Sequence, residues 1–286
     1  MSNQGGFQYF ILTRFNLLLW RKDKEGNKVR SREWLEHRFM LFERYCLPSI
    51  ANQTCNEFEW IVLFDSNTPD SFKERIIEQQ TNCPQLKPVF VEPEKGHCFA
   101  EIFRKEVAHR LSHGQGRVLT TYLDNDDSLD IHFVEDIQQR ALELPDGTFI
   151  YYTEGYQFFT DHKYLMKIHY PRNHFVSVLE RGNPETIKTI YGYGSHYYID
   201  KIKGASIEYV NSLPMWCQVV HEKNMGNDAY FLGAKMINQK TLLIDDFGVQ
   251  EEVKYGFGMY LLRFLPRYAK TLIRRCKIKL RGYRFE

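Results

Sequence analysis

The sequence lacks the cysteine patterns that mark zinc-binding modules and disulfide-rich folds. Its six cysteines, at positions 46, 55, 83, 98, 217 and 276, are scattered, and no two of them have C-x-x-C spacing. Short and regular spacing is what a zinc knuckle or a disulfide framework requires. We therefore expect reduced thiols, as in a cytoplasmic protein.

Long hydrophobic segments are missing as well. The stretch MSNQGGFQYFILTRF has no charged residue ahead of its apolar run, so the sequence predicts no secretory signal peptide. No apolar run approaches the ~20 residues that cross a bilayer. The expected location is the cytoplasm, with any membrane contact peripheral and at the inner face of the cytoplasmic membrane.

Charge is unevenly distributed, although the formal net charge of the 286 residues is only +2. Residues 263–286 hold nine of the 38 basic residues and one of the 36 acids, so the first 262 residues carry a net charge of −6. Apolar residues recur in this tail at helical spacing, with basic residues opposite them. We expect a basic amphipathic helix over 256–286 that lies on anionic lipid. A solvated helix packed on its own domain is the alternative, and nucleic-acid binding is disfavoured because the rest of the chain is acidic.

Strand-like and helical segments alternate in the first half of the chain. Strands are expected at 7–13, 58–65, 86–92 and 117–124, and helices at 31–48, 68–80, 98–112 and 130–144. For the first helix, Ser31 is the expected N-cap and Pro48 the end, and Thr68 followed by proline indicates a capped start of the second. This alternation predicts an α/β fold whose parallel sheet is covered by helices on both faces.

The second half of the chain has a different composition. From Phe149 to Tyr198 there are 13 aromatic residues and four histidines, and two antiparallel strands are expected around the turn Asp161–His162. With no linker visible, we expect one domain over 1–255, in which 7–145 and 146–255 form two halves of different composition.

Three acids follow the fourth expected strand in RVLTTYLDNDDSLD, residues 117–130. Carboxylates this close repel each other unless a cation lies between them. A D-x-D pair such as Asp124 and Asp126 offers the oxygen ligands that Mg²⁺ and Mn²⁺ prefer, and these ions bridge to diphosphate. The alternative is a helix start, with Asp127 or Ser128 as its cap. Arg14 and Asp65 also follow expected strands, and ligands bind at the carboxyl ends of parallel strands.

Three segments carry a resemblance to a known family: ILTRFN (11–16), LDNDD (123–127) and WCQVVHEKN (216–224). In this order they resemble glycosyltransferases of the GT-A fold and, more narrowly, the bacterial rhamnosyltransferase family, over about residues 7–225. The resemblance implies a GT-A type, Rossmann-like mixed sheet, in which 7–145 would be the nucleotide-sugar-binding half and 146–255 the acceptor-binding half.

The resemblance also implies roles for individual residues. Asp126 would bind the metal, Asp124 the metal or the ribose, and His221 would complete the metal shell, although a histidine after an apolar strand is often only structural. Arg14 would contact the nucleotide diphosphate and Asp65 the base or ribose. Arg104 is a further candidate for nucleotide binding.

An inverting transferase also needs a carboxylate to deprotonate the acceptor, whereas a retaining one does not. Glu154, Glu180, Glu185 and Glu222 are candidates, and Glu180 and Glu222 are taken as the catalytic pair to test, with Glu180 favoured. Sugar rings stack on aromatic faces, so the acceptor-binding candidates are Tyr193, His196 and Trp216. An ordinary aromatic strand with glycine bends is the alternative for YGYGSHYY (191–198).

The sequence thus predicts a metal-dependent glycosyltransferase that uses Mn²⁺ or Mg²⁺. It would move a sugar, rhamnose by resemblance, from a nucleotide sugar to a glycan or lipid-linked glycan in bacterial surface polysaccharide synthesis. A sugar-phosphate nucleotidyltransferase is the second reading, but the first strand is not followed by the glycine-rich loop that it would need. A non-catalytic glycan- or membrane-binding protein on a degenerate scaffold is the third.

Overall fold

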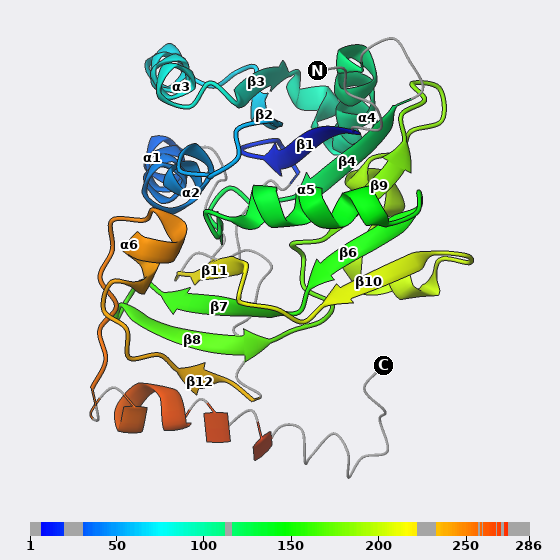
Figure 1. Ribbon diagram of the computed structural model, residues 1–286. Helices are drawn as coiled ribbons and strands as arrows, with labels where there is room; N and C mark the ends of the chain where they lie inside the picture. The colour runs from blue at the N-terminus through cyan, green and yellow to red at the C-terminus, as the bar shows by residue number, and fades with distance from the viewer. Residues whose placement is uncertain are drawn as a thin grey trace.

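The computed structural model describes residues 7–19, 31–111, 116–221 and 233–256, together with parts of 258–273. Two sheets and the helices around them make up this part of the chain (Figure 1). None of its helices is long and apolar enough to cross a membrane.

The larger sheet has seven strands in the order β10-β6-β9-β4-β1-β2-β3. Four of them are parallel neighbours at one side: β1 (Phe7–Arg14), β2 (Glu59–Asp65), β3 (Leu86–Val91) and β4 (Arg117–Tyr122). Antiparallel β9 (Ser177–Arg181) joins them to β6 (Thr148–Tyr152), and parallel β10 (Ser206–Val210) forms the edge. The second half of the chain therefore completes the sheet that the first half begins.

Helices cover both faces of this sheet because the side chains of β1 alternate between two cores. Ile11 packs with residues of α1 (Arg32–Leu41), α3 (Asp70–Asn82) and α5 (Phe133–Glu143). Its neighbour Leu12 packs with α4 (Phe99–Arg110) and the 3₁₀ turn η3 (Ile190–Tyr193). Alternation of this kind is what a strand buried on both faces requires. The mixed sheet with helices on both faces confirms the predicted α/β fold.

The smaller sheet lies beneath the larger one in Figure 1 and has the order β12-β8-β7-β11-β5. Its strands are β5 (Ser128–Leu129), β7 (Glu154–Phe159), β8 (Tyr164–His169), β11 (Trp216–Val220) and β12 (Lys235–Met236). Strands β7 and β8 are antiparallel, as expected around Asp161–His162. Helix α6 (Leu242–Phe247) packs on this sheet through a separate apolar core.

The first helix does not end at Pro48, which corrects the sequence prediction. Ser31 caps α1 as expected, but the helix continues through the π-helical turn η1 (Phe42–Cys46) into α2 (Leu47–Ala51). In η1 the Leu47 N–H donates to the Phe42 carbonyl, one residue further back than in an α-helix. Such a π-turn lets a helix pass a proline, which has no N–H to donate.

Two other expected helix starts differ from the structure. Thr68 does not cap α3; its hydroxyl donates to the Asp65 carbonyl and accepts from the Asn16 amide. Helix α5 begins at Phe133, because Ser128 pairs in β5 and the acids before it do not cap the helix. The helix-start reading of the acid cluster is therefore wrong.

Gly155 in β7 allows the indole ring of Trp216 to lie against the backbone. A Cβ atom at this position would stand 2.2 Å from two atoms of that ring. The other face of the indole stacks on Phe175, with ring centroids 4.7 Å apart. Trp216 is 1% exposed and donates its Nε1–H to the Tyr152 carbonyl, so it cannot shift easily.

We therefore expect Gly155→Ala to lower the free energy of unfolding by about 1–3 kcal/mol, as overpacking of a full core does. Denaturant unfolding followed by tryptophan fluorescence measures this change. Gly116→Ala is the matched control, since a Cβ there meets nothing within 4 Å. Equal stability of the two variants would contradict the packing described here.

Candidate active site

The acid cluster is held at the carboxyl ends of β1 and β4 by the side chain of Asn125. Its amide donates to the carbonyl oxygens of Arg14 (3.1 Å) and Phe15 (2.7 Å), and its own oxygen accepts from Arg38. Asn125 is only 3% exposed, so the loop after β4 is anchored from within. This anchor fixes the loop that carries the three acids.

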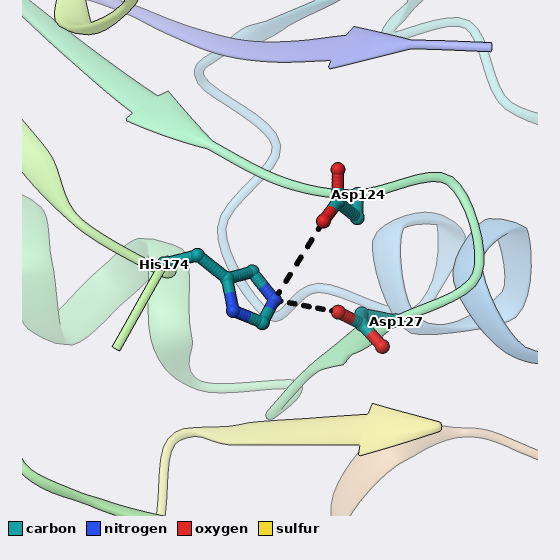
Figure 2. Close-up of side chains that lie close together, drawn as sticks. All are labelled: Asp124, Asp127 and His174. Atoms are coloured by element: carbon teal, nitrogen blue, oxygen red, sulfur yellow. Dashed lines mark hydrogen bonds and ion pairs between the residues drawn. The ribbon is translucent and has the colours of Figure 1, made fainter. Parts of the chain in front are cut away.

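Asp124 and Asp127 converge on His174, which lies just before β9 (Figure 2). The His174 Nε2 atom is 2.7 Å from Asp127 Oδ2 and 3.9 Å from Asp124 Oδ2. The other oxygen of Asp127 accepts the N–H of Val219 at 2.8 Å. These three side chains offer ligand atoms within 4.8 Å of one another, and two carboxylates with an imidazole suit Mn²⁺.

Asp126 lies in a second arrangement, between α1 and the end of β11. Its Oδ2 atom is 2.9 Å from His221 Nε2 and accepts from the Arg38 guanidinium at 3.2 Å. Its Oδ1 atom accepts no hydrogen bond from the part of the chain that the structure describes. Asp126 and His221, which lie 95 positions apart in the sequence, are thus in contact as the prediction of a shared site requires.

These surroundings separate the acids electrostatically. Burial opposes ionisation of Asp126, but Arg38 and His221 hold the pKa of its carboxyl well below the usual range. Burial raises the pKa of Asp127 to about 7, although the bond from His174 opposes this. Burial also disfavours charge on His174, yet its bond to Asp127 raises the pKa of the imidazole. The surroundings therefore favour the ionised form of Asp126, whereas Asp127 and His174 form a buried carboxyl–imidazole pair.

Arg14 lies beside these acids in a cage of aromatic rings. Its guanidinium carbon is 4.6 Å from the ring centre of Phe99 and 5.2 Å from that of Tyr191. It donates to the Tyr122 hydroxyl at 2.8 Å, and that hydroxyl donates to Asp124 at 2.8 Å. The cage holds a permanent positive charge at the edge of the acid cluster, where a diphosphate beside a metal would need one.

A match to a protein-family model assigns the chain to a known family. Residues 8–231 match the model described as "Putative rhamnosyl transferase". The chain is a member of this rhamnosyl transferase family. None of the curated proteins matches it.

Solved structures that resemble the chain include TarS from S. aureus. Full TarS is 12% identical with a TM-score of 0.40, over 75% of this chain and 37% of that one. TarS 1–349 in complex with UDP is also 12% identical with a TM-score of 0.40, over 75% of this chain and 61% of that one. The chain therefore spans less than two thirds of the length of these TarS chains.

Other candidates for nucleotide binding in this family member lie in different settings. Asp65 is 2% exposed, and its Oδ1 accepts the N–H of Asn67 at 2.7 Å. Arg104 on α4 pairs with Glu101 in the same helix and approaches the Pro184 carbonyl at 3.4 Å. The contacts of Arg104 connect α4 to the turn after β9, and they do not link it to the acids.

The catalytic role predicted for Glu180 finds no support in its contacts. Both carboxylate oxygens are engaged, by the N–H groups of Lys188 and Thr189 at 3.0 and 2.9 Å and by the Tyr193 hydroxyl at 3.0 Å. Burial raises its pKa, while these donors oppose the rise. Glu180 thus fixes the turn that carries Tyr191 to Arg14. Glu222, the other candidate base, lies outside the described residues.

The predicted acceptor-binding residues are placed unequally. Trp216 is buried in the core, and Tyr193 is half-buried with its hydroxyl on Glu180. His196 stays near the acids, with its ring centre 6.0 Å from that of His174, and burial lowers its pKa to about 4. The segment 191–198 forms the turns η3 and η4 (His196–Lys201), so reading it as an ordinary strand was wrong.

Sequence reasoning missed two residues of the site, Arg38 and His174. Arg38 belongs to the polar face of an amphipathic helix, where arginine is unremarkable. His174 was visible only as one of four histidines in the aromatic segment. Neither has a local motif, because each reaches the acids through the tertiary fold.

Asp130, which ends the acidic stretch, should make stability depend on pH. Burial raises the pKa of its carboxyl from 3.8 to about 6, against the opposing bond from the His132 N–H. A raised folded-state pKa means that this contribution to stability is complete below 3.8 and is lost as pH rises through about 6.

Asp130→Asn keeps an oxygen for the His132 N–H but cannot ionise. We expect its melting temperature to exceed that of the parent by about 2–4 °C at pH 8, and to equal it at pH 3.5. Thermal unfolding followed by circular dichroism at both pH values measures the difference. A gap that is the same at both would rule out Asp130 as its cause.

Proposed function

We propose that this rhamnosyl transferase family member transfers a sugar, rhamnose by its family, from a nucleotide sugar to a glycan acceptor. The observation that carries the proposal is the convergence of Asp124, Asp126 and His221 with Arg14 at the carboxyl ends of β1 and β4. Anionic ligands of open α/β sheets bind at this edge. Carboxylates placed there beside an arginine suit a diphosphate that arrives with a divalent cation.

Mn²⁺ or Mg²⁺ would be held by Asp126 and His221, with Asp124 beside them and donor phosphates completing the shell. Asp126 fits this role because its Oδ1 atom has no partner among the described residues. The group of Asp124, Asp127 and His174 is the competing centre, but Asp127 is 1% exposed and both of its oxygens accept hydrogen bonds. When bound, the metal would stabilise negative charge on the departing diphosphate.

Residues around the metal site would bind the diphosphate and hold the D-x-D loop in place. Arg14 binds the diphosphate with a charge that its aromatic cage keeps in place. Arg38 keeps Asp126 ionised and, through Asn125, fixes the position of the D-x-D loop. Asp127 and His174 hold the loop to β11 through the Val219 N–H. Asp65 and Arg104 stay predictions for nucleotide contact, and Glu180 and Glu222 stay predictions for the base.

The nucleotidyltransferase reading is less well supported. Such an enzyme needs a glycine-rich loop after the first strand to cradle phosphates with backbone N–H groups. Here β1 is followed by Phe15, Asn16 and Leu17, and the Phe15 N–H already donates to the Leu63 carbonyl at 2.9 Å. A degenerate, non-catalytic scaffold would bind no nucleotide in a metal-dependent way, which the following experiment tests.

Thermal shift with a panel of nucleoside diphosphates, each with and without Mn²⁺, tests the site. We expect one diphosphate to stabilise the parent more strongly with Mn²⁺ than without. Asp126→Asn and His221→Gln should lose that extra stabilisation, with at least tenfold weaker Mn²⁺-dependent binding, because each removes a ligand. His174→Gln should retain it, provided that the variant melts cooperatively.

The reverse pattern, with loss in His174→Gln and retention in Asp126→Asn, would move the metal to the competing centre. No Mn²⁺-dependent binding of any diphosphate by the folded parent would refute the proposed function.

We further propose that the C-terminal segment contacts anionic membrane, where a lipid-linked glycan would be presented. Phe264 is 4% exposed, belongs to the main core and stacks on Tyr268. Leu262 and Ile273 are 75% and 55% exposed. One side of the segment thus packs on the domain, while another exposes apolar side chains in a strongly basic stretch. Exposed apolar side chains and a high density of basic residues both favour binding at an anionic lipid surface.

Leu262→Asp should lower sedimentation of the full chain with phosphatidylserine-containing vesicles severalfold at low salt. The substitution leaves Phe264 in place, which truncation before the segment would not. Leu213→Asp is the matched control, because Leu213 is 77% exposed outside the tail. Binding should weaken as ionic strength rises. Equal sedimentation of both variants and the parent would contradict a role of the tail in lipid binding.

A further inference from the structure

Four tyrosines form an aromatic surface on the second half of the chain: the exposed Tyr197 and Tyr198 in η4 and Tyr209 in β10, and the partly buried Tyr170 after β8. We call this surface the tyrosine platform. Five large aromatic side chains are exposed in the part of the chain that the structure describes, and three of them, Tyr197, Tyr198 and Tyr209, are here. Aromatic side chains gathered at a surface usually mark a place where something binds.

Contacts beneath the surface hold the platform in shape. The Tyr170 hydroxyl donates to the Tyr197 hydroxyl at 3.0 Å. Tyr151, which is buried, stacks on Tyr209 with ring centroids 5.8 Å apart and donates its hydroxyl to the His196 carbonyl at 2.9 Å. Tyr151 therefore ties β10 to the backbone at the start of η4, and Tyr197 and Tyr209 have less conformational freedom to lose on binding.

The platform is continuous with the acid cluster. The ring of His196 lies 3.9 Å from that of Tyr197 and 6.0 Å from that of His174, measured between centres. His174 in turn lies 3.9 Å from Asp124. A ligand that extends from the reacting position over His196 would thus come to lie on the tyrosines.

Charges around the platform are largely paired. Arg172 pairs with Asp200 at 3.3 Å, and Glu154 pairs with His169 at 2.7 Å and Lys167 at 3.3 Å. An anionic lipid surface would call for unpaired basic residues, and an apolar partner helix for a groove without hydroxyls. Phenol rings offer apolar faces edged with hydroxyls, which match the faces and hydroxyls of an uncharged sugar ring.

We propose that the tyrosine platform binds a neutral sugar unit of the acceptor glycan, beyond the unit whose hydroxyl reacts. The inference rests on the proposed function, because the adjoining acid cluster must supply the reaction. It assigns acceptor recognition to Tyr170, Tyr197, Tyr198 and Tyr209, with His196 as the link to the reacting position.

Binding of the labelled full chain to an array of neutral and acidic oligosaccharides, some containing L-rhamnose, tests the platform. The parent should bind at least one neutral oligosaccharide. Tyr197→Ala should weaken that binding about tenfold, as the loss of one stacking ring does. Tyr197→Phe keeps the ring and should stay within about threefold of the parent. Tyr255→Ala should bind as the parent does, because Tyr255 is 49% exposed outside the platform.

Mn²⁺-dependent stabilisation by a nucleoside diphosphate, measured on the same variants, separates this inference from the proposed function. Tyr197→Ala should leave that stabilisation unchanged. Nucleotide binding without binding of any neutral oligosaccharide would overturn the platform while leaving the donor site intact. Equal binding by Tyr197→Ala and the parent, or binding of acidic oligosaccharides alone, would overturn it too. Oligosaccharide binding without nucleotide binding would support the platform and refute the transferase.

Discussion

Three carboxylates within four positions, at Asp124, Asp126 and Asp127, impose the constraint around which this structure is arranged. Such charges can be packed together only if counter-charges or shared protons offset their repulsion. The fold supplies these from separate elements: Arg38 from α1, His174 from the segment before β9, and His221 from the end of β11. Strand order, helix position and loop anchoring all serve to bring these partners to one edge of the sheet.

The same constraint gives the acids different properties. Arg38 and His221 favour the ionised form of Asp126, whose Oδ1 has no partner among the described residues, whereas Asp127 is buried against His174. The proposed cation-binding position and a buried structural contact therefore lie side by side in one short loop. Asn125 anchors this loop, since its amide donates to two carbonyl oxygens at the end of β1. The aromatic cage of Arg14 and the tyrosine platform lie on either side of the acids, where we propose that a diphosphate and an acceptor sugar bind.

Much of the fold could be predicted because its signals are local. Apolar runs ending at Arg14, Asp65 and Tyr122 give parallel strands, and helical spacing between them gives the covering helices. Predictions failed where a neighbour outside the local segment changed the outcome. Pro48 does not end its helix because a π-turn accommodates it, and Thr68 does not cap α3 because Asn16 and Asp65 engage its hydroxyl. Trp216, expected at the acceptor, is instead buried between Phe175 and Gly155.

By itself, the sequence determined the fold class and the position of the acids at a strand end. Periodicity and the charge of side chains are properties of the chain, so they can be read before it folds. Only the tertiary structure decided which acid contacts Arg38, His174 or His221. It also decided that the carboxylate of Glu180 accepts hydrogen bonds from the backbone of the following turn, and which tyrosines reach the surface. Those outcomes depend on distances between segments up to 95 positions apart, and no local pattern in the sequence encodes such distances.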